Sequence, residues 1–407
     1  MIYDLIIIGA GAAGLFAAAN VVPGHRVLVL EKTEKPGQKL LLAGSGQGNL
    51  TNSRDIKEFL HCYGPNGNRL RPVLFPFSNR ALTAHLEAQG LPLITRPDGK
   101  VFPTSLDARD VRDLFLTLAE KNGVAFRYQA PVTTLKPSES GQGRYQLQTS
   151  SHTFYTENVL VSTGGASFPR TGSDGGFFAC LETLGIPLIP RRPALVPVHV
   201  YDYPYTALSG IAFPDCGLEI RAGAKSISAY GSLLLTHGSF SGPVVLDNAR
   251  YLEQGAKISI HYLPGIDGAT LRQRLLAAAK GSPKQIVTLL ENETQLPRRF
   301  LEVVCGRASL PADTKAARLG GPEMGQLAAL LTDDTYTVSG TGGFQTAMAT
   351  AGGVCLDEVE LQTLSARHHP GLYFAGEVLD VDGDTGGYNL QFAFSSARLV
   401  VKQVFGV

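Results

Sequence analysis

The residues whose types and spacing point most directly to chemistry form a glycine-rich turn early in the sequence. Gly9-x-Gly11-x-x-Gly14 follows the apolar run "YDLIII" and precedes a helix of small residues. At this spacing Gly9 permits a tight turn, Gly11 lets backbone approach a pyrophosphate, and Gly14 lets the helix pack closely on the strand. The helix start, with Ala12 and Ala13, offers N–H groups and a partial positive charge to phosphates. We therefore predict a dinucleotide site here.

The second strand of the same unit ends in an acid that suits a ribose. The run "RVLVLEK" contains Glu31, seventeen residues after Gly14, and Lys32 follows it. A carboxylate at this position accepts hydrogen bonds from the ribose diol, and its negative charge disfavours a 2′-phosphate. We predict that both Glu31 and Lys32 contact the cofactor. A strand, a fingerprint, a helix and a closing acid in this order are far more specific than GxGxxG alone.

The connection over residues 32–52, "KTEKPGQKLLLAGSGQGNLTN", indicates which dinucleotide to expect. A simple dehydrogenase would continue into another βα unit, whereas this glycine-rich stretch suggests backbone running past a flat ligand. We therefore predict FAD. The sequence contains no second strand–GxGxxG–helix unit, so NADH or NADPH, if used, must dock transiently against the flavin. The predicted contacts in this connection are Lys39, Gly46, Gly48, Asn49 and Thr51, and a simply exposed position is the alternative for Lys39.

Residues 376–391, "GEVLDVDGDTGGYNLQ", have the alternating acids of a calcium loop. An EF-hand loop requires glycine at its sixth position and a bidentate glutamate at its twelfth. With Asp380 in first place, those positions hold Thr385 and Gln391. Because both fail, we predict no metal site, and we expect Asp380 and Asp384 to brace the turn.

We interpret the same stretch as the return of the chain to the flavin. A helix begins after the glycine-rich turn, and its N–H groups would face the electron-rich pyrimidine edge of the flavin. The residues at this helix start are Gly387, Tyr388, Asn389 and Leu390. A second turn, "STGG", contains Thr163 and Gly164 and is expected beside the adenine end of the cofactor.

Two residues are candidates for a catalytic acid or base. His237 lies between a predicted strand and "SFSGP", and Tyr388 lies beside the predicted flavin edge. The alternatives are a turn histidine bonded to backbone for His237 and a packing role for Tyr388. Hydride transfer by a flavin does not require a protein base for every substrate, so an enzyme needs neither assignment.

These residues require a particular set of elements to position them. The expected fold class is α/β, with a discontinuous Rossmann-type FAD-binding domain, an inserted β-rich domain and a small helical cap. From about residue 190 the sequence changes to short β-like runs with many turn residues, and amphipathic helical segments follow. The predicted ranges are 1–190 and 340–407 for the FAD-binding domain, 191–265 and 325–339 for the β-rich insert, and 266–324 for the cap.

Several stretches, in order, resemble one bacterial flavoprotein family. Besides the 32–52 connection they are residues 159–185, 191–198, 235–246 and 371–397. They look like the family that includes BaiN, YhiN and aminoacetone-oxidase-like proteins, over nearly the whole chain. The resemblance implies an FAD-dependent oxidoreductase whose insert faces the substrate. It also implies that Gly376 and Glu377 lie at the ribityl chain.

The same resemblance covers chemistries as different as reduction of a conjugated enone and oxidation of an amine. Two positions depart from the family pattern. Gly48 stands where a cysteine is usual, which removes a thiol from the expected flavin neighbourhood, and Ser239 stands where a glycine is usual.

Composition limits the classes of partner. The 407 residues include 36 basic and 35 acidic side chains, so the chain lacks the basic footprint of a nucleic-acid binder. Five scattered cysteines indicate reduced thiols, and neither a signal peptide nor an unbroken apolar span is evident. We predict a cytoplasmic oxidoreductase that exchanges a hydride between flavin N5 and a small organic molecule. The alternatives are an FAD-dependent RNA-modifying enzyme and a non-catalytic flavin-binding redox sensor, and no oligomeric state is predicted.

Overall fold

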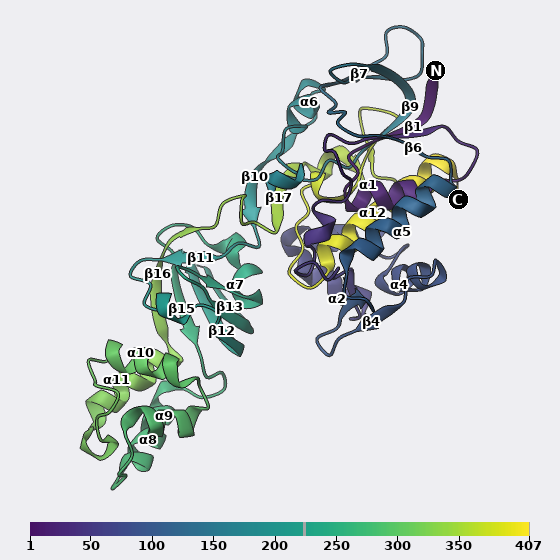
Figure 1. Ribbon diagram of the computed structural model, residues 1–407. Coiled ribbons are helices and arrows are strands. Elements are labelled where there is room, and N and C mark those ends of the chain that lie inside the picture. Colours follow the sequence, from purple (N-terminus) through teal and green to yellow (C-terminus); the bar gives the residue numbers. More distant parts are fainter. Residues whose placement is uncertain (223–224, 407) are drawn as a thin grey trace. The chain divides into compact units, whose positions relative to one another are not determined.

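The computed structural model describes residues 1–222 and 225–406, and the chain divides into two compact units (Figure 1). The first unit comprises Met1–Ala194 and Phe344–Val407, and the second comprises Leu195–Gly343. The second unit is therefore an insertion in the first. Among the described residues no helix is both long and apolar enough to cross a membrane.

The first unit is built on a sheet whose central strands are parallel. In sheet order these strands are β20 (Leu372–Phe374), β9 (Thr153–Val161), β1 (Ile2–Ile8), β2 (Val27–Leu30) and β6 (Ala125–Arg127). At the centre Ile7 lies opposite Val29 on one side and Leu160 on the other, and all three are fully buried. Continuous apolar burial is typical of parallel strands covered on both faces. The predicted α/β class, a Rossmann-type domain with a β-rich insertion, is confirmed.

Three helices lie side by side in this unit (Figure 1). They are α1 (Ala12–Ala19), α5 (Ala108–Lys121) and α12 (Tyr388–Phe405). The small side chains of α1 allow both neighbours to approach, and Phe16 fills the remaining space. Its ring centroid lies 5.0 Å from that of Phe394 and 5.3 Å from that of Phe115, so one buried aromatic cluster connects all three helices.

Shorter elements complete the first unit. They are β3 (Thr51–Asn52), α2 (Ile56–Phe59), α3 (Arg71–Leu74), α4 (Asn79–Ala88), β4 (Leu93–Thr95), β5 (Lys100–Pro103), β7 (Thr134–Pro137), β8 (Tyr145–Gln148), α6 (Phe178–Thr183), β10 (Leu188–Ala194), β17 (Ala349–Val354), β18 (Val359–Glu360) and β19 (Ser365–Ala366). Strands β10 and β17 pair with each other, with Ala194 opposite Ala349. They carry the chain out of this unit and back into it.

The second unit contains a closed barrel and a group of helices. The barrel strands, in order round the barrel, are β11 (Val198–Val200), β14 (Phe240–Ser241), β13 (Lys225–Leu235), β12 (Ala212–Ala222), β15 (Lys257–His261) and β16 (Asp334–Thr341). The helices are α7 (Pro243–Leu246), α8 (Gly268–Ala279), α9 (Ile286–Thr294), α10 (Arg298–Arg307) and α11 (Gly321–Thr332). Helix α11 continues beyond residue 324, where the predicted cap ends, because Leu327 and Leu331 extend its buried stripe.

A buried polar network joins the helices of this unit to the barrel. Asp334, 1% exposed at the start of β16, accepts from Arg307 Nη2 at 2.7 Å and Nη1 at 2.8 Å. Three tyrosine hydroxyls also donate to Asp334 Oδ2: Tyr205 at 2.8 Å, Tyr262 at 3.1 Å and Tyr336 at 2.5 Å. Since Arg307 is the last residue of α10, the network fixes the end of this helix against the barrel.

Candidate functional site

The glycine-rich turn at residues 9–14 has the geometry that a bound pyrophosphate requires. Gly9 has φ +96°, and a β-carbon at Gly14 would lie 1.9 Å from the Gly9 carbonyl oxygen. A β-carbon at Gly11, by contrast, would meet nothing within 4 Å. Two of the three glycines are therefore needed by the protein itself, and the third faces open space where backbone can meet a ligand. Ala12 and Ala13 lie in the first turn of α1, directly behind this space.

Glu31 is held at the end of β2 by hydrogen bonds from two neighbouring segments. It is 8% exposed; Oε2 accepts from Ala10 N at 2.6 Å, and Oε1 accepts from Thr33 N and Thr33 Oγ1, both at 2.8 Å. An ionised carboxylate has about four acceptor positions, so Glu31 can still accept from a ribose. Lys32 Nζ pairs with Asp174 Oδ1 at 2.6 Å, and its predicted contact with the cofactor stays a prediction.

Two hydroxyl groups beside the glycine-rich turn have no hydrogen-bond partner among the residues that the structure describes. They are Thr163 Oγ1 and Ser173 Oγ, and both atoms are buried. Gly164 lies between them with φ +73°, and a β-carbon there would be 3.0 Å from Ser173 Oγ. A buried polar group without a partner costs about 1–3 kcal/mol, so native proteins rarely leave one unless a ligand or water satisfies it. These hydroxyls fit a polar cofactor, and sequence analysis identified Thr163 but missed Ser173.

A compact charged cluster lies at Glu377, which comes shortly after β20. Lys39 Nζ bonds to Glu377 Oε2 at 2.6 Å, although 338 positions separate the two residues. Ser167 Oγ donates to Glu377 Oε1 at 2.7 Å, and Lys39 Nζ also donates to Ser167. Thr350 on β17 accepts from the backbone N–H groups of Ala166 at 2.9 Å and Ser167 at 3.1 Å. Lys39 is thus an ion-pair partner of Glu377 rather than an isolated surface cation.

The start of α12 is fixed against the 49–52 segment. The Asn49 amide, oriented to satisfy both neighbours, accepts from Gly387 N at 3.2 Å and donates to Thr51 O at 3.2 Å. Thr51 Oγ1 bonds to Gln391 Oε1 at 2.6 Å. A β-carbon at Gly387, where φ is +101°, would lie 2.6 Å from Thr51, so only glycine allows this approach. The N-cap residue, Gly387, has no side chain that could accept from the first N–H groups of the helix.

The side chains of Tyr388 and Asn389, at the start of α12, make contacts inside the protein. The Tyr388 ring is 3% exposed and packs edge-on against Phe59 at 4.9 Å between centroids. Burial, and next the nearby Cys62, raise the pKa of Tyr388 well above its ordinary value. Asn389 bonds both backbone groups of Gly383 at 2.8 Å. The Tyr388 ring therefore packs inside the protein, and its role in proton transfer stays a prediction.

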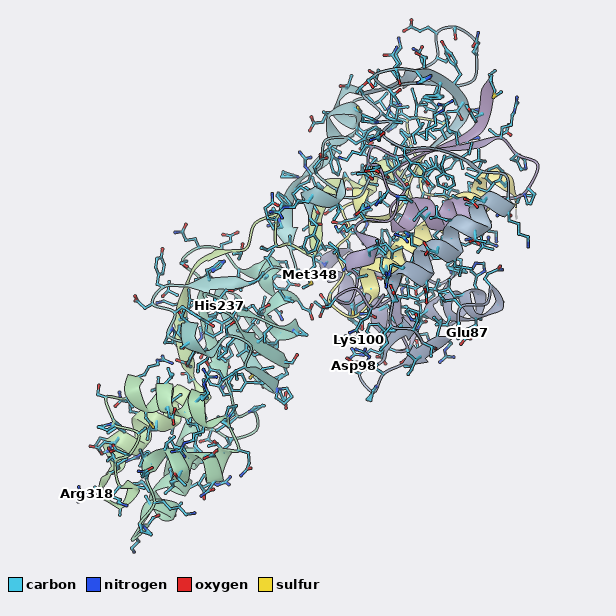
Figure 2. The ribbon with its side chains drawn as sticks, viewed as in Figure 1. Glu87, Asp98, Lys100, His237, Arg318 and Met348 are labelled. Atoms are coloured by element: carbon cyan, nitrogen blue, oxygen red, sulfur yellow. The ribbon has the colours of Figure 1, made fainter. Side chains whose placement is uncertain are left out.

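The other predicted positions occupy distinct places. Gly376 has φ +73°, and a β-carbon there would lie 3.1 Å from Ala13 Cβ, so this glycine brings the Glu377 loop onto α1. Gly46 accepts at its carbonyl from Ala108 N at 2.9 Å and so supports the start of α5. His237 is exposed at the turn between β13 and β14 in the second unit (Figure 2). The catalytic role of His237 stays a prediction.

Within the 376–391 stretch, Asp380 makes hydrogen bonds that hold the turn in place. Asp380 Oδ1 accepts from Gly352 N at 2.9 Å, and the Asp380 carbonyl accepts from Asn66 Nδ2 at 2.8 Å. Asp380 thereby braces the turn, as expected. Over residues 1–222 and 225–406, no group of three or more His, Cys, Asp or Glu residues is placed to hold a metal ion.

Comparison with known proteins adds the family. A family model described as HI0933-like protein Rossmann domain matches residues 3–403. The chain belongs to the HI0933-like family. This agrees with the resemblance inferred from the sequence motifs, and the match includes both units of the structure.

Relatives of this HI0933-like protein carry two kinds of name. The chain is 32% identical to a ribosomal RNA dihydrouridine synthase of Escherichia coli, over 97% of this chain and 96% of the relative. It is 29% identical to a 3-dehydro-bile acid delta(4,6)-reductase of Clostridium scindens, over 97% of both chains. A solved 3-ketosteroid-delta4-(5alpha)-dehydrogenase from Rhodococcus jostii has a TM-score of 0.52 at 17% identity, covering 99% of this chain and 96% of that one. This last likeness concerns the fold alone.

The structure explains how this HI0933-like chain accommodates its two departures. Gly48 has φ +77°, and a β-carbon there would lie 3.3 Å from both Pro103 and Ala108, so a cysteine would be strained and directed at α5. Ser239 is not at a positive φ, and its hydroxyl bonds to Thr236 Oγ1 at 2.7 Å. Glycine is therefore unnecessary at 239, and the serine adds a hydrogen bond to the turn.

Proposed function

We propose that this HI0933-like protein is an FAD-dependent reductase of a carbon–carbon double bond conjugated with a carbonyl group. The observation that carries the proposal is the uncapped start of α12, held by Asn49 and Thr51. Its backbone N–H groups and partial positive charge suit the flavin edge that becomes negative on reduction. When bound, FAD would supply the hydride at N5. Because such a helix start stabilises the reduced flavin, it favours transfer of electrons to the flavin from a donor such as NADH or NADPH.

The first unit supplies a place for each part of FAD. The turn at residues 9–14 would hold the pyrophosphate, since Gly11 faces open space. Glu31 would accept from the adenosine ribose. The Lys39–Glu377 pair would meet the ribityl hydroxyls, because its carboxylate accepts hydrogen bonds and its ammonium group donates them.

The names of the relatives support the proposal that the bond reduced is a carbon–carbon double bond conjugated with a carbonyl group. In the uracil ring the C5=C6 bond is conjugated with the C4 carbonyl, and in a 3-dehydro bile acid the delta(4,6) bonds are conjugated with the 3-oxo group. Both relatives therefore act, by name, on a double bond that a carbonyl activates toward hydride. The carbonyl accepts the charge that develops, which makes the same flavin chemistry suitable for very different substrates.

A visible spectrum of the purified protein, followed by anaerobic titration, tests this proposal. We expect bound FAD that is bleached by NADH or NADPH and reoxidised without oxygen by a conjugated acceptor. The acceptors are 2-cyclohexen-1-one, 4-androstene-3,17-dione and deproteinised ribosomal RNA. Protein that is colourless and cannot be reconstituted with FAD refutes the cofactor assignment. Bound flavin that none of the acceptors reoxidises refutes the reaction class and favours the redox sensor.

Ribosomal RNA is the second candidate substrate, because the charge of the chain is uneven. Residues 268–332 hold nine basic and five acidic side chains, whereas the rest of the chain holds 27 basic and 30 acidic ones. Four exposed cations gather where the 280–285 and 312–318 segments meet, with Arg318 at the far end of the helices (Figure 2). They are Lys280, Lys284, Lys315 and Arg318. No ion pair involves any of the four within the described part of the chain, so they are available to phosphates.

Salt-dependent RNA binding tests this candidate. The double variant Lys284→Glu/Arg318→Glu should weaken binding of a fluorescein-labelled RNA stem-loop and reduce the slope of log K against log salt by about 2. The matched control, Lys57→Glu/Lys121→Glu, reverses two exposed cations of the first unit. Equal effects of the two double variants would show non-specific attraction. No binding by the wild type would leave the small conjugated ketone as the substrate class.

A further inference from the structure

One segment of the first unit lies against the part of the site expected to hold adenosine. Residues 171–175, which we call the adenosine loop, follow the "STGG" turn. Gly172 has φ +96°, and a β-carbon there would be 2.8 Å from Thr33 Cγ2 and 3.3 Å from Lys32 Cε. The loop therefore touches the residues that follow Glu31 at the end of β2. This is the strand end at which a Rossmann-type domain binds the ribose of its nucleotide.

Two further contacts hold the adenosine loop in place. Asp174 Oδ1 pairs with Lys32 Nζ at 2.6 Å and also accepts from Gly176 N at 2.9 Å. Arg191 Nη1 donates to the Gly175 carbonyl at 3.0 Å. Lys32 and Arg191, from distant parts of the unit, thus anchor the loop directly after Ser173.

Ser173 itself is the exception within this anchored loop. Ser173 is 7% exposed, and its Oγ is buried with no hydrogen-bond partner within residues 1–222 and 225–406. The neighbouring Thr171 hydroxyl, by contrast, donates to the Phe168 carbonyl at 2.8 Å. Thr163 Oγ1, on the other side of Gly164, is also buried and without a partner. Two such hydroxyls, both next to Gly164, indicate a polar ligand group at this place.

We propose that Ser173 binds the AMP half of FAD and that the adenosine loop forms the outer wall of that subsite. The Ser173 hydroxyl donates a hydrogen bond to a phosphate or ribose oxygen, and the Lys32–Asp174 pair holds the loop closed over it. This inference rests on the FAD binding proposed above. It adds a wall to the adenosine subsite at the end of β2, next to Glu31 and Thr33.

Comparison of FAD with FMN tests the inference, because FMN lacks the AMP half. Affinities of the full-length apoprotein for each flavin are measured by quenching of flavin fluorescence. Ser173→Ala should weaken FAD binding about tenfold, the effect of one hydrogen bond to a charged or polar ligand group, and leave FMN binding unchanged. Ser151→Ala, which removes an exposed serine hydroxyl of the same unit, is the matched control and should change neither affinity.

The melting temperature of the apoprotein separates ligand binding from a structural role. Because Ser173→Ala removes a buried hydroxyl that has no protein partner, apoprotein stability should not fall. Asp174→Asn should loosen the loop and weaken FAD binding while sparing FMN. Equal losses for FAD and FMN, unchanged FAD binding, or a lower apoprotein melting temperature would each overturn the inference. Wild-type protein that binds neither flavin would instead refute the proposed function.

Discussion

The Asp334 network offers the most direct test of how the second unit is held together. The substitution Asp334→Asn keeps the shape of the side chain but removes its charge. It leaves Arg307 and three tyrosine hydroxyls directed at an amide that accepts at only one atom. Removal of one partner from a buried ion pair destabilises a protein by about 3–5 kcal/mol. Asp334 is 1% exposed and Arg307 is 24% exposed by side chain, so solvent screens the pair little. We expect a loss near the lower end of that range.

The assay is urea unfolding of the full-length protein followed by circular dichroism and tyrosine signals, since the chain has 14 tyrosines and no tryptophan. Flavin absorbance, followed in parallel, reports on the first unit and should respond less. Tyr336→Phe removes one hydroxyl and should cost about 1 kcal/mol. Glu302→Gln breaks an exposed pair with Arg298 in the same unit and should cost less than about 0.5 kcal/mol. An Asp334→Asn midpoint equal to that of Glu302→Gln would refute the reasoning.

Three further predictions concern the cofactor site and pH. Glu31→Ala should weaken FAD binding at least tenfold in a fluorescence titration, and unchanged affinity would place the adenosine ribose elsewhere. Gly14→Ala should lower both melting temperature and flavin content, because its β-carbon would overlap the Gly9 carbonyl; Gly11→Ala should lose flavin at nearly the wild-type apoprotein melting temperature. Burial raises the pKa of Cys305 from 9.0 to about 11, so the neutral thiol stabilises the folded state fully below pH 9. That contribution, about 3 kcal/mol, should be lost between pH 9 and about 11, and Cys305→Ala should flatten this part of a melting-temperature profile.

The features that could be predicted from the sequence are those that depend on residue types within one short stretch of the chain. The Gly9 turn, Glu31 and the start of α12 each follow from residue types within a short stretch, because a nucleotide-binding turn has a fixed spacing. The turn between β4 and β5 likewise has a local signal, since Asp98-Gly99 is a typical hairpin sequence and Gly99 has φ +81°.

The rest depended on contacts between distant segments. The Lys39–Glu377 pair joins residues 338 positions apart, and no pattern in either segment names the other. Ser173 lies in a stretch whose sequence signal is its glycines, and its significance is the absence of a partner, which exists only in three dimensions. Tyr388 looks available for proton transfer from its position in the chain. Its ring turns instead toward Phe59, because the aromatic core behind α12 buries it.

The paired strands β10 and β17 also determine how the inserted unit could be exchanged between related proteins. Ala194 and Ala349 lie opposite each other in the first unit, and just beyond them Gly342 N donates to Pro197 O at 2.9 Å in the second. The two junctions of the inserted segment are therefore neighbours, so residues 195–343 can be exchanged as one cassette without moving the ends of the host domain. The relatives named as a ribosomal RNA dihydrouridine synthase and a 3-dehydro-bile acid delta(4,6)-reductase offer natural cassettes. Grafting them onto one flavin-binding host would show directly which unit chooses the substrate.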